Sequence, residues 1–381
     1  MTYRRDAFTW TAFAALFAFG YVNAVLGPSL PYIRSVEHIS YVVAALHQVA
    51  FAVGGGIAGV VSAGDPVSLS RRTTIAGGLG GAAVAALAVG YGNAAPVTIA
   101  AALLMGLAAT LALIRVWAAL ADAHGDRRAV AMSEGEVAVS LAGIATPLVI
   151  GALAATAATW RLAFAVGAAT LAFAIVSVLR SEVPEPSSVM RQGSREGRLQ
   201  PTLVIVIAVV ALEFALSFWL ASYLNDSVRL TRDTAVALVS TLYAANLAGR
   251  LGASVLVRTR TADRVLLSGL GMVLLGLPFL LSATSAIVAV IGIVVTGAGI
   301  GALFPLTSSL HVQASEGSAD SALGEILFVA AFGQMGGALG AGAIAQATNL
   351  RVGLVVLLPL LALLAAVGLA AHRRDARTAV G

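Results

Sequence analysis

One carboxylate stands out among the residues of this sequence that could do chemistry. Glu213 lies near the middle of the apolar run VIVIAVVALEFALSFWL, and no basic residue is near it in the sequence. A charge inside so long an apolar run is costly unless it has a partner or a water-filled cavity. Burial favours the neutral, protonated form of a carboxyl group. A buried carboxyl group can therefore take up and release a proton closer to neutral pH, as proton coupling requires. We therefore expect Glu213 to couple proton movement or to bind a substrate; the alternative is a structural hydrogen bond to a neighbouring helix.

Several uncharged polar or aromatic residues also occur inside apolar runs. His47 is a second candidate for proton coupling because an imidazole can change its charge near neutral pH, although a lone histidine is more often a structural group. Other residues could line a cavity that binds a substrate, or could merely join helices. These substrate-binding candidates are Asn23, Gln48, Tyr243, Asn246, Gln334, Phe214, Ser217 and Trp219.

Four charged residues fall near the expected cytoplasmic ends of apolar runs. Side chains in such places can extend to the interface or form ion pairs between loops. Alternatively, they could exchange partners as a cytoplasmic gate. The gate candidates are Asp65, Arg115, Glu136 and Glu325.

Motifs for other chemistries are absent from the sequence. There is no cysteine, so a disulfide framework and a thiolate metal site are excluded. The five histidines are scattered, and neither HExxH, GxSxG nor a Walker motif occurs. We expect no catalytic residue, no metal, no cofactor and no nucleic-acid partner, and therefore no enzyme.

The elements that must position these residues are apolar on every side. Of the 381 residues, 59% are hydrophobic and 11% are charged, and the mean hydropathy is +0.94. Soluble domains have roughly 25% charged residues, and a bilayer-spanning helix needs roughly 20 apolar residues. The sequence therefore predicts an all-α membrane protein with transmembrane helices near residues 8–30, 40–63, 73–93, 97–121, 129–155, 160–180, 202–224, 233–256, 263–284, 286–310, 321–347 and 350–371.

The basic residues predict the orientation of these helices. With the N-terminus in the cytoplasm, only a few of the 23 basic residues fall on outside loops; these are Arg34, Arg161, Arg229, Arg232 and Arg351. Because cytoplasmic loops are enriched in Lys and Arg, we expect both termini in the cytoplasm and the chain in the cell (inner) membrane.

The polar stretch 181–201 separates two sets of six helices. It is rich in proline, serine and mixed charge, as is typical of a linker. The predicted domains are an N-terminal bundle at 1–180, a cytoplasmic linker at 181–201 and a C-terminal bundle at 202–381. Weak matches at an offset of about 190 residues favour a duplicated six-helix unit: Gly135-Glu136 with Gly324-Glu325, Gly106 with Gly297, and Gly59 with Gly249.

This organisation resembles the major facilitator superfamily over essentially the whole chain. The segments that carry the resemblance are GYVNAVLGPSLPYIR (20–34), the loop with Gly64, Asp65, Arg71 and Arg72, Gly249-Arg250, GAGIGALFPLTSSL (297–310) and Trp160-Arg161. The resemblance implies two pseudo-symmetric six-helix bundles around a central cavity, transport by alternating access and a functional monomer in the lipid bilayer.

Two departures from the family's drug antiporters bear on the direction of transport. Aligned on Gly106, the fourth helix has Ala102 where those antiporters carry an arginine. In the fifth helix, only Pro147 and Gly151 match their glycine-rich motif. Both departures reduce the weight of an efflux function.

We therefore expect a secondary active transporter, a symporter that uses the proton gradient to move a small polar metabolite such as a sugar-like molecule. The alternative within transport is proton-driven efflux of drugs or metabolites, with an apolar pocket lined by aromatic residues such as Phe214, Phe218, Trp219 and Trp117. The alternatives from another class are a transport-dead membrane sensor and a membrane-embedded enzyme.

Overall fold

The computed structural model describes residues 4–64, 70–156, 159–184, 200–314 and 319–378. In these ranges the chain forms α-helices and one short 3₁₀ helix, and it contains no strand. The helices are α1 (Ala7–Glu37), α2 (Tyr41–Gly64), α3 (Arg71–Tyr91), α4 (Ala95–His124), η1 (Gly125–Arg127), α5 (Arg128–Ala154), α6 (Leu162–Arg180), α7 (Pro201–Asp226), α8 (Arg232–Leu256), α9 (Ala262–Ser282), α10 (Ala286–Ala314), α11 (Ala319–Ala347) and α12 (Leu350–Thr378).

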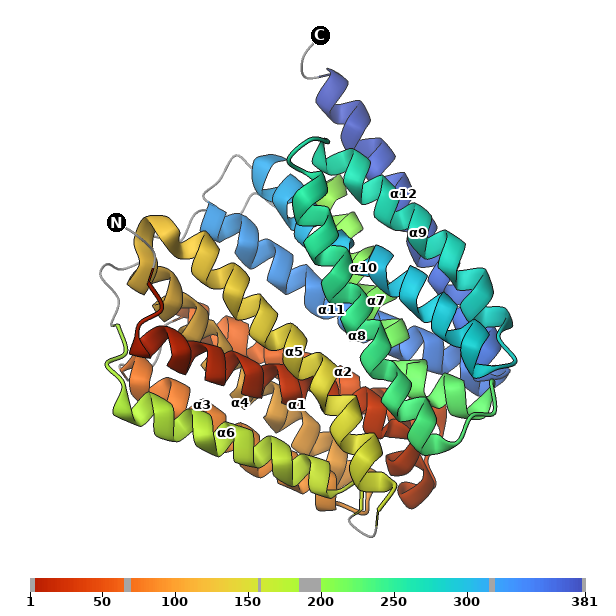
Figure 1. The fold of residues 1–381 in the computed structure, drawn as a ribbon, viewed down its shortest axis with the longest axis horizontal. Coiled ribbons are helices and arrows are strands. Elements are labelled where there is room, and N and C mark those ends of the chain that lie inside the picture. Colours follow the sequence, from red (N-terminus) through yellow and green to blue (C-terminus); the bar gives the residue numbers. More distant parts are fainter. Residues whose placement is uncertain (1–3, 65–69, 157–158, 185–199, 315–318, 379–381) are drawn as a thin grey trace. The chain divides into compact units, whose positions relative to one another are not determined.

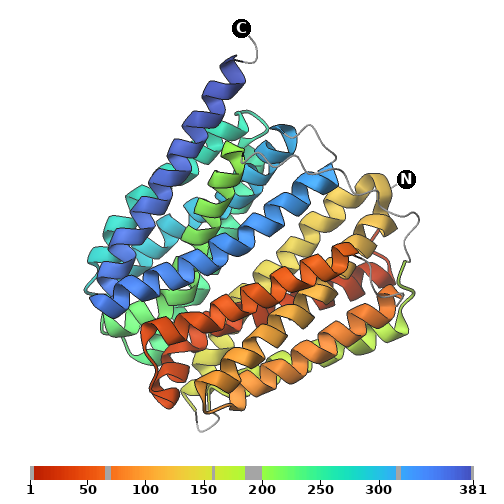
Figure 2. The same ribbon diagram turned by 180° about the vertical axis from the view of Figure 1, so that it is seen from behind.

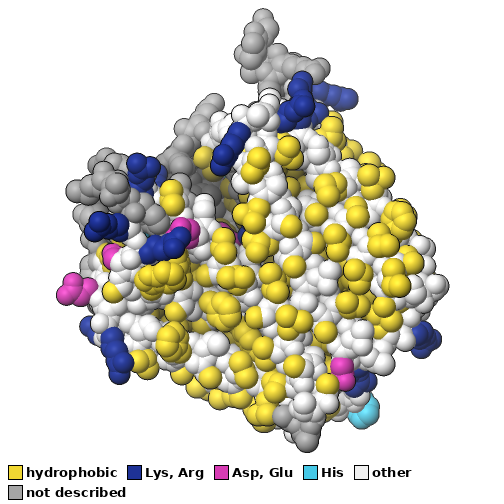
Figure 3. Space-filling model, viewed as in Figure 1, with side chains coloured by type: hydrophobic (Ala, Val, Ile, Leu, Met, Phe, Trp, Pro, Cys, Tyr) yellow, Lys and Arg dark blue, Asp and Glu magenta, His cyan; other side chains and the backbone are white. Residues whose placement is uncertain are grey.

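The predicted all-α membrane fold is confirmed. Within the described ranges, eleven helices are long and apolar enough to cross a membrane. The remaining long helix is α8, whose interior carries the polar residues Asn246 and Arg250. Hydrophobic side chains are spread over the visible face of the molecule, and the charged side chains gather toward its upper left and lower right (Figure 3).

The first helix is longer than predicted. The apolar run predicted an end near residue 30, but α1 continues past Pro28 and Pro31 to Glu37 and ends at His38, a left-handed residue with φ 54°. A proline removes one backbone hydrogen bond and its ring crowds the preceding turn. Both prolines lie among buried residues, so packing on neighbouring helices holds the helix together past them.

The chain divides into two compact units. Unit 1 comprises Met1–Ile39 and Leu46–Met190, and unit 2 comprises Ser40–Ala45 and Arg191–Gly381. The first residues of α2 thus group with unit 2. Most of the predicted linker, residues 185–199, lies outside the described residues. Within each unit the helices run side by side (Figures 1 and 2).

The same helix pairs form in both units. In unit 1, α1 packs on α5 and α3 packs on α4 and α6; in unit 2, α7 packs on α11 and α9 packs on α10 and α12. Each pair of unit 2 therefore lies six helices after its counterpart. This correspondence supports the duplicated unit that the sequence predicts.

Close helix contacts at glycine repeat in the same way. A side chain on Gly106 of α4 would collide with the carbonyl oxygen of Phe51 in α2, and one on Gly301 of α10 would collide with that of Asn246 in α8. The second contact follows the first by 195 residues (106 to 301 and 51 to 246), so the counterpart of Gly106 is Gly301 and the predicted match with Gly297 is wrong. Packing also makes Gly54, rather than the predicted Gly59, the counterpart of Gly249, because each faces a backbone carbonyl of the partner helix.

Two arginines expected on outside loops have a structural role. Arg161 donates to the carbonyl oxygen of Gly90 at the end of α3, at 2.7 Å. Arg351 donates to the carbonyl oxygens of Leu281 and Ala283 at the end of α9, at 2.8 and 2.9 Å. Both guanidinium groups satisfy carbonyls that a helix C-terminus leaves unpaired. This role explains their position in otherwise arginine-poor loops.

Candidate functional site

Four predicted site residues come together in unit 2. Glu213 and Ser217 lie one turn apart on α7, and Tyr243 and Asn246 lie one turn apart on the facing side of α8. The Asn246 side-chain amide donates to Oε1 of Glu213 at 3.3 Å, and the Tyr243 hydroxyl lies close to Ser217 and Glu213. We refer to these four residues as the polar cluster.

Asn246 is held in place by its backbone. Its carbonyl oxygen lies against Gly301 of α10, where there is no room for a side chain. The side chain is buried, and its Oδ1 has no hydrogen-bond partner among the described residues. An unpaired buried acceptor costs about 1–3 kcal/mol. Asn246 therefore presents an acceptor that a hydroxyl or N–H donor of a bound solute could satisfy.

The polar cluster combines groups of different chemistry. Glu213, which is half-buried, offers a carboxylate that can bind a proton or accept a hydrogen bond. The Tyr243 and Ser217 hydroxyls can donate and accept, and the Asn246 amide can do both. The arrangement suits recognition of a polar solute.

The aromatic candidates do not share one environment. Trp219 is fully buried, and its indole N–H donates to the carbonyl oxygen of Ala338 in α11 at 2.8 Å. Its ring packs edge to face against Phe218 and Tyr41. Trp219 therefore joins α7 to α11 within unit 2. Phe214, next to Glu213, is half-buried.

The other polar candidates are dispersed. Gln334 is half-buried on α11, and no hydrogen bond joins it to the polar cluster. Asn23 and Gln48 belong to unit 1: Asn23 is half-buried in the middle of α1, and Gln48 is buried on α2. The buried Nε2 of Gln48 donates no hydrogen bond to any described residue.

His47 lies in a buried group that the sequence did not predict. Its Nε2 is 2.9 Å from Oγ1 of Thr98 in α4, and that hydroxyl donates to Oε1 of Glu37 at 2.8 Å. The sequence placed Glu37 in a loop because α1 was expected to end near residue 30. Thr98 lies 61 residues from Glu37 in the chain, so no local pattern could have joined them.

The gate candidates are divided between the two units, with Arg115 and Glu136 in unit 1 and Glu325 in unit 2. Asp65 lies outside the described residues. Arg115 is half-buried on α4, and Glu136 is exposed on α5. Glu325 of α11 is 3.2 Å from Nε2 of His311 in α10.

Other ion pairs could not be recognised from the sequence. Arg5 makes two hydrogen bonds to Glu134, at 2.6 and 2.9 Å. Arg71 lies 2.7 Å from Asp122, between the start of α3 and the end of α4. These pairs join segments of unit 1 that are far apart in sequence.

A threonine–histidine pair occurs at the same place in each unit. Oγ1 of Thr9 in α1 is 2.8 Å from Nε2 of His124 in α4. Oγ1 of Thr202 in α7 is 2.7 Å from Nδ1 of His311 in α10. Each pair joins the start of the first helix of its unit to the end of the fourth. These histidines look scattered in the sequence because their partners lie more than a hundred residues away.

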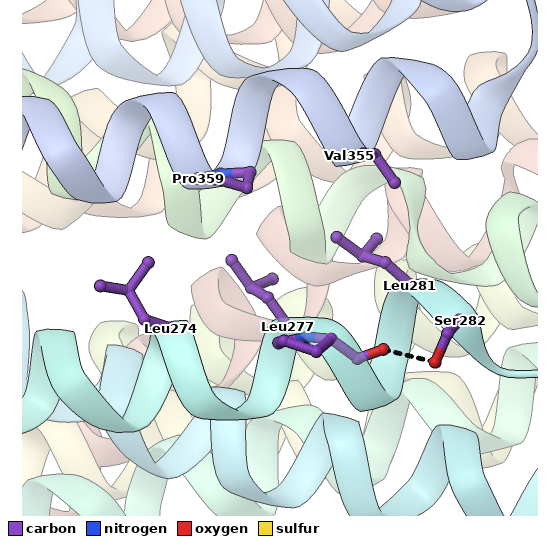
Figure 4. Close-up of a pocket in the computed structure, with 7 residues that line it drawn as sticks. Leu274, Leu277, Leu281, Ser282, Val355 and Pro359 are labelled. Carbon is purple, nitrogen blue, oxygen red and sulfur yellow. Dashed lines mark hydrogen bonds between the residues drawn. The ribbon is translucent and has the colours of Figure 1, made fainter.

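An apolar groove on unit 2 lies apart from these polar groups. It has a volume of about 530 Å³ and lies between α9 and α12, with Leu277, Leu281, Val355 and Pro359 in its lining. The Ser282 hydroxyl at its end donates to the carbonyl oxygen of Pro278 (Figure 4). The other side chains that line the groove are apolar, and the Ser282 hydroxyl is already hydrogen-bonded. The groove therefore offers little to orient a polar solute, and it is not the candidate site. In the described part of the chain, no group of three His, Asp or Glu residues could hold a metal ion.

Comparison with known proteins places this fold. The family model of the Major Facilitator Superfamily matches residues 12–324. A bacterial homologue of the human lysosomal transporter Spinster, in an inward-facing and occupied conformation, is similar with a TM-score of 0.76, at 14% identity over 96% of each chain. No curated protein sequence matches the chain significantly.

Two further solved structures are similar at the level of fold. The nucleoside transporter NupG has a TM-score of 0.76 and 13% identity, over 97% of this chain and 99% of that one. A D-xylose-proton symporter has a TM-score of 0.74 and 13% identity, over 96% of each chain.

Proposed function

Because the chain belongs to the major facilitator superfamily, a family of membrane transporters, we propose that it is a proton-coupled secondary transporter of a small polar solute. It works by alternating access, as a functional monomer in the cell (inner) membrane with both termini in the cytoplasm. The proton gradient supplies the energy, and no cofactor takes part.

The observation that carries the proposal is the polar cluster between α7 and α8. A carboxylate, an amide, a phenol and a hydroxyl converge between the apolar helix α7 and the more polar helix α8. Polar groups inside membrane helices are costly and are usually functional. The buried Oδ1 of Asn246, which no described residue satisfies, favours a ligand that donates hydrogen bonds.

A polar metabolite fits this cluster better than an apolar one. Sugars and nucleosides carry several hydroxyl groups that can both donate and accept hydrogen bonds. Two structural neighbours are transporters named for such solutes, a nucleoside and D-xylose. At 13% identity these neighbours give chemical classes to test and no substrate assignment.

Glu213 is the proposed coupling residue of the cluster. In its ionised form the carboxylate accepts the hydrogen bond from Asn246. Protonation would remove the charge and give Glu213 a donor of its own. The proton and the solute would then compete for, or share, the same hydrogen-bonding partners, which links their binding.

Efflux of apolar compounds is the weaker alternative. It needs aromatic side chains that face a pocket, but Trp219 is fully buried and joins α7 to α11 through its indole N–H. The departures from the antiporter motifs, including Ala102 in the fourth helix, also favour uptake.

Ligand binding to purified protein in detergent tests the proposal. D-xylose, uridine, amino acids, carboxylates and lipophilic cations are added separately, and thermal unfolding is followed. A ligand at about 100 times its dissociation constant should stabilise the folded protein by about 2.7 kcal/mol. We expect stabilisation by a hydroxyl-rich solute, reduced in Asn246→Ala and Glu213→Gln.

The matched control is Gln313→Ala, which removes an amide from an exposed position on α10. It should leave the ligand-induced shift unchanged. Stabilisation by lipophilic cations alone would support efflux instead. A polar ligand whose shift is the same in all variants would refute the role of the polar cluster.

A further inference from the structure

Unit 1 contains a carboxylate and an imidazole joined by one hydroxyl group. Oγ1 of Thr98 lies 2.8 Å from Oε1 of Glu37 and 2.9 Å from Nε2 of His47. The three residues come from the end of α1, the first half of α2 and the first turn of α4. None of them belongs to the polar cluster of unit 2.

The group is closed off from its surroundings. The His47 side chain is 0% exposed and the Glu37 side chain 2% exposed, and Thr98 is fully buried. Burying an ionised carboxylate is costly unless its oxygens are hydrogen-bonded or paired. Only one Glu37 oxygen meets this condition, since Oε2 has no hydrogen-bond partner among the described residues.

The second carboxylate oxygen of Glu37, Oε2, is close to the His47 imidazole but does not hydrogen-bond to it. Oε2 of Glu37 lies 3.9 Å from Nε2 of His47, beyond hydrogen-bonding distance. The threonine hydroxyl therefore makes the connection. It is closer to Oε1 of Glu37, at 2.8 Å, than to the carbonyl oxygens of Ala94 and Ala95, at 3.3 and 3.2 Å. When it donates to Glu37, its oxygen accepts from an N–H of His47. This arrangement requires that Nε2 carries a hydrogen.

The charged groups around the site are few. Arg161, in the connection before α6, acts on Glu37 through its charge, but its guanidinium donates to Gly90, Gly92 and Asn93. Arg34 precedes Glu37 by one turn on α1, and the exposed His38 follows it. Gln48 is the polar neighbour of His47 on α2, and α4 carries no ionisable residue between Thr98 and Arg115.

We propose that Glu37, Thr98 and His47 form a second proton-binding site, which holds one exchangeable proton in unit 1. With the extra proton on His47, the imidazole carries hydrogens on both nitrogens and Glu37 is ionised. The proton on Nε2 moves to the Thr98 oxygen while the Thr98 hydroxyl hydrogen moves to Oε1 of Glu37. His47 and Glu37 are then both neutral, and Thr98 again carries one hydroxyl hydrogen, which came from His47.

The site would add a proton-loading step to the proposed transport cycle. Its role in coupling rests on the proposed function, whereas its binding of a proton does not. The change from an ion pair to two neutral groups alters what holds α1, α2 and α4 together at this end of unit 1. Glu37 is the last residue of α1, so a movement of this terminus could open the site to a proton.

Infrared difference spectroscopy of the purified full-length protein tests the proposal, with protons as the only ligand. The sample is titrated between about pH 5 and pH 8, where histidine changes charge, and the carboxylic acid C=O band is recorded. We expect a band that is lost in Glu37→Gln and remains in Glu213→Gln. In Thr98→Val the band should persist at higher wavenumber, because the carboxyl group loses its hydrogen bond.

The outcomes separate this site from the proposed function. A titration with no band that depends on Glu37 would show a permanently ionised, structural carboxylate and would overturn the site. If Glu37→Gln does not fold, Glu37→Asp is used in its place. The proposal then requires the band to shift in Glu37→Asp, and an unshifted band would overturn the site. A Glu37 band in a protein without proton-driven solute accumulation would refute the proposed function and leave the site standing.

Discussion

At the residue scale, the carboxylates of this chain differ in what satisfies their oxygens. Asp6 accepts from the backbone N–H and the hydroxyl of Thr9, both at 2.7 Å. Glu213 accepts a longer bond from Asn246. Glu37 has one oxygen bonded to Thr98, whereas its Oε2 has no hydrogen-bond partner among the described residues. The Asp6 pattern stabilises a helix, whereas Oε2 of Glu37 keeps hydrogen-bonding capacity for a proton.

Asp6 should stabilise α1 in a pH-dependent way. Partial burial raises the pKa of its carboxyl group, but the hydrogen bonds from Thr9 and the charge of His124 outweigh this and lower the pKa below its ordinary value of 3.8. A lowered pKa in the folded state means that the stabilisation is present above pH 3.8 and is lost as the pH falls below it.

Asp6→Ala should reduce the free energy of unfolding by about 1 kcal/mol at neutral pH, because the helix loses its N-cap. Asp6→Ser should restore most of this stability, since a serine hydroxyl can also cap a helix, and it should remove the acid sensitivity. Denaturation measured at neutral and acid pH checks both expectations. Equal stability of Asp6→Ala and the unmodified chain would contradict them.

At the scale of elements, the glycine contacts between α8 and α10 fix the position of Asn246. In Gly301→Ala the new methyl group would meet the carbonyl of Asn246. The backbones would have to separate, at a cost of about 1–3 kcal/mol. Gly252→Ala in α8 is the control, because a side chain there meets no atom within 4 Å, and it should gain up to about 1 kcal/mol in helix propensity.

Unfolding midpoints and ligand binding together check this expectation. Gly301→Ala should lose stability and also weaken binding of the solute, because Asn246 is displaced. Gly252→Ala should keep its binding unchanged. A fully stable Gly301→Ala variant with normal binding would show that the helices have more room than the structure gives.

Arg351 should be important for the stability of unit 2. Its guanidinium donates to three backbone carbonyls, including Ser227 at 3.0 Å. Since hydrogen bonds to charged groups are the stronger kind, Arg351→Ala should cost about 2–4 kcal/mol. Arg229→Gln, which alters an exposed arginine in the same part of the unit, should change little. Similar losses in the two variants would argue against the specific role of Arg351 in capping α9.

The helices could be predicted from the sequence more readily than the contacts between them. Apolar runs long enough to cross a bilayer locate α2 to α11 to within a few residues. The ends of α1 and α12 were missed because both helices continue past the apolar run, to Glu37 and Thr378. A helix that leaves the membrane no longer needs apolar side chains, so hydropathy does not show where it stops.

The sequence could predict only part of the candidate site, because it shows polar residues inside apolar runs but not the contacts between helices. Glu213 and Asn246 stand out because each is a polar residue in an apolar run, and the structure joins them. The Glu37–Thr98–His47 group depends on three helices meeting. A threonine in a membrane helix is unremarkable by itself, since it can bond its own backbone; only tertiary structure shows its second partner.

At the scale of the whole molecule, the chain repeats one six-helix pattern. Arg161 and Arg351 cap the third helix of each unit, and the threonine–histidine pairs Thr9–His124 and Thr202–His311 join the first helix to the fourth. Against this shared pattern, the two units differ at particular residues. His311 also contacts Glu325 at 3.2 Å, and Asn246 of unit 2 occupies the place of Phe51 in unit 1.

The proposed orientation can be tested directly because the chain has no cysteine. Thr259→Cys and Thr284→Cys place single thiols just outside opposite ends of α9, at exposed positions. In intact cells, a membrane-impermeant thiol reagent should label only Thr284→Cys, because the arginine-rich end is expected in the cytoplasm. Labelling of Thr259→Cys alone would reverse the topology.

Solute accumulation in proteoliposomes under an imposed proton gradient tests the central claim most directly. The assay compares D-xylose, uridine, amino acids, carboxylates and lipophilic cations in the unmodified protein and in Glu213→Gln. We expect one polar solute to accumulate against its gradient when the outside is acidic. A protonophore should abolish this accumulation, and in Glu213→Gln only solute exchange should remain. Accumulation of lipophilic cations alone, polar flux indifferent to the proton gradient, or no flux of any solute would contradict proton-coupled transport of a polar metabolite.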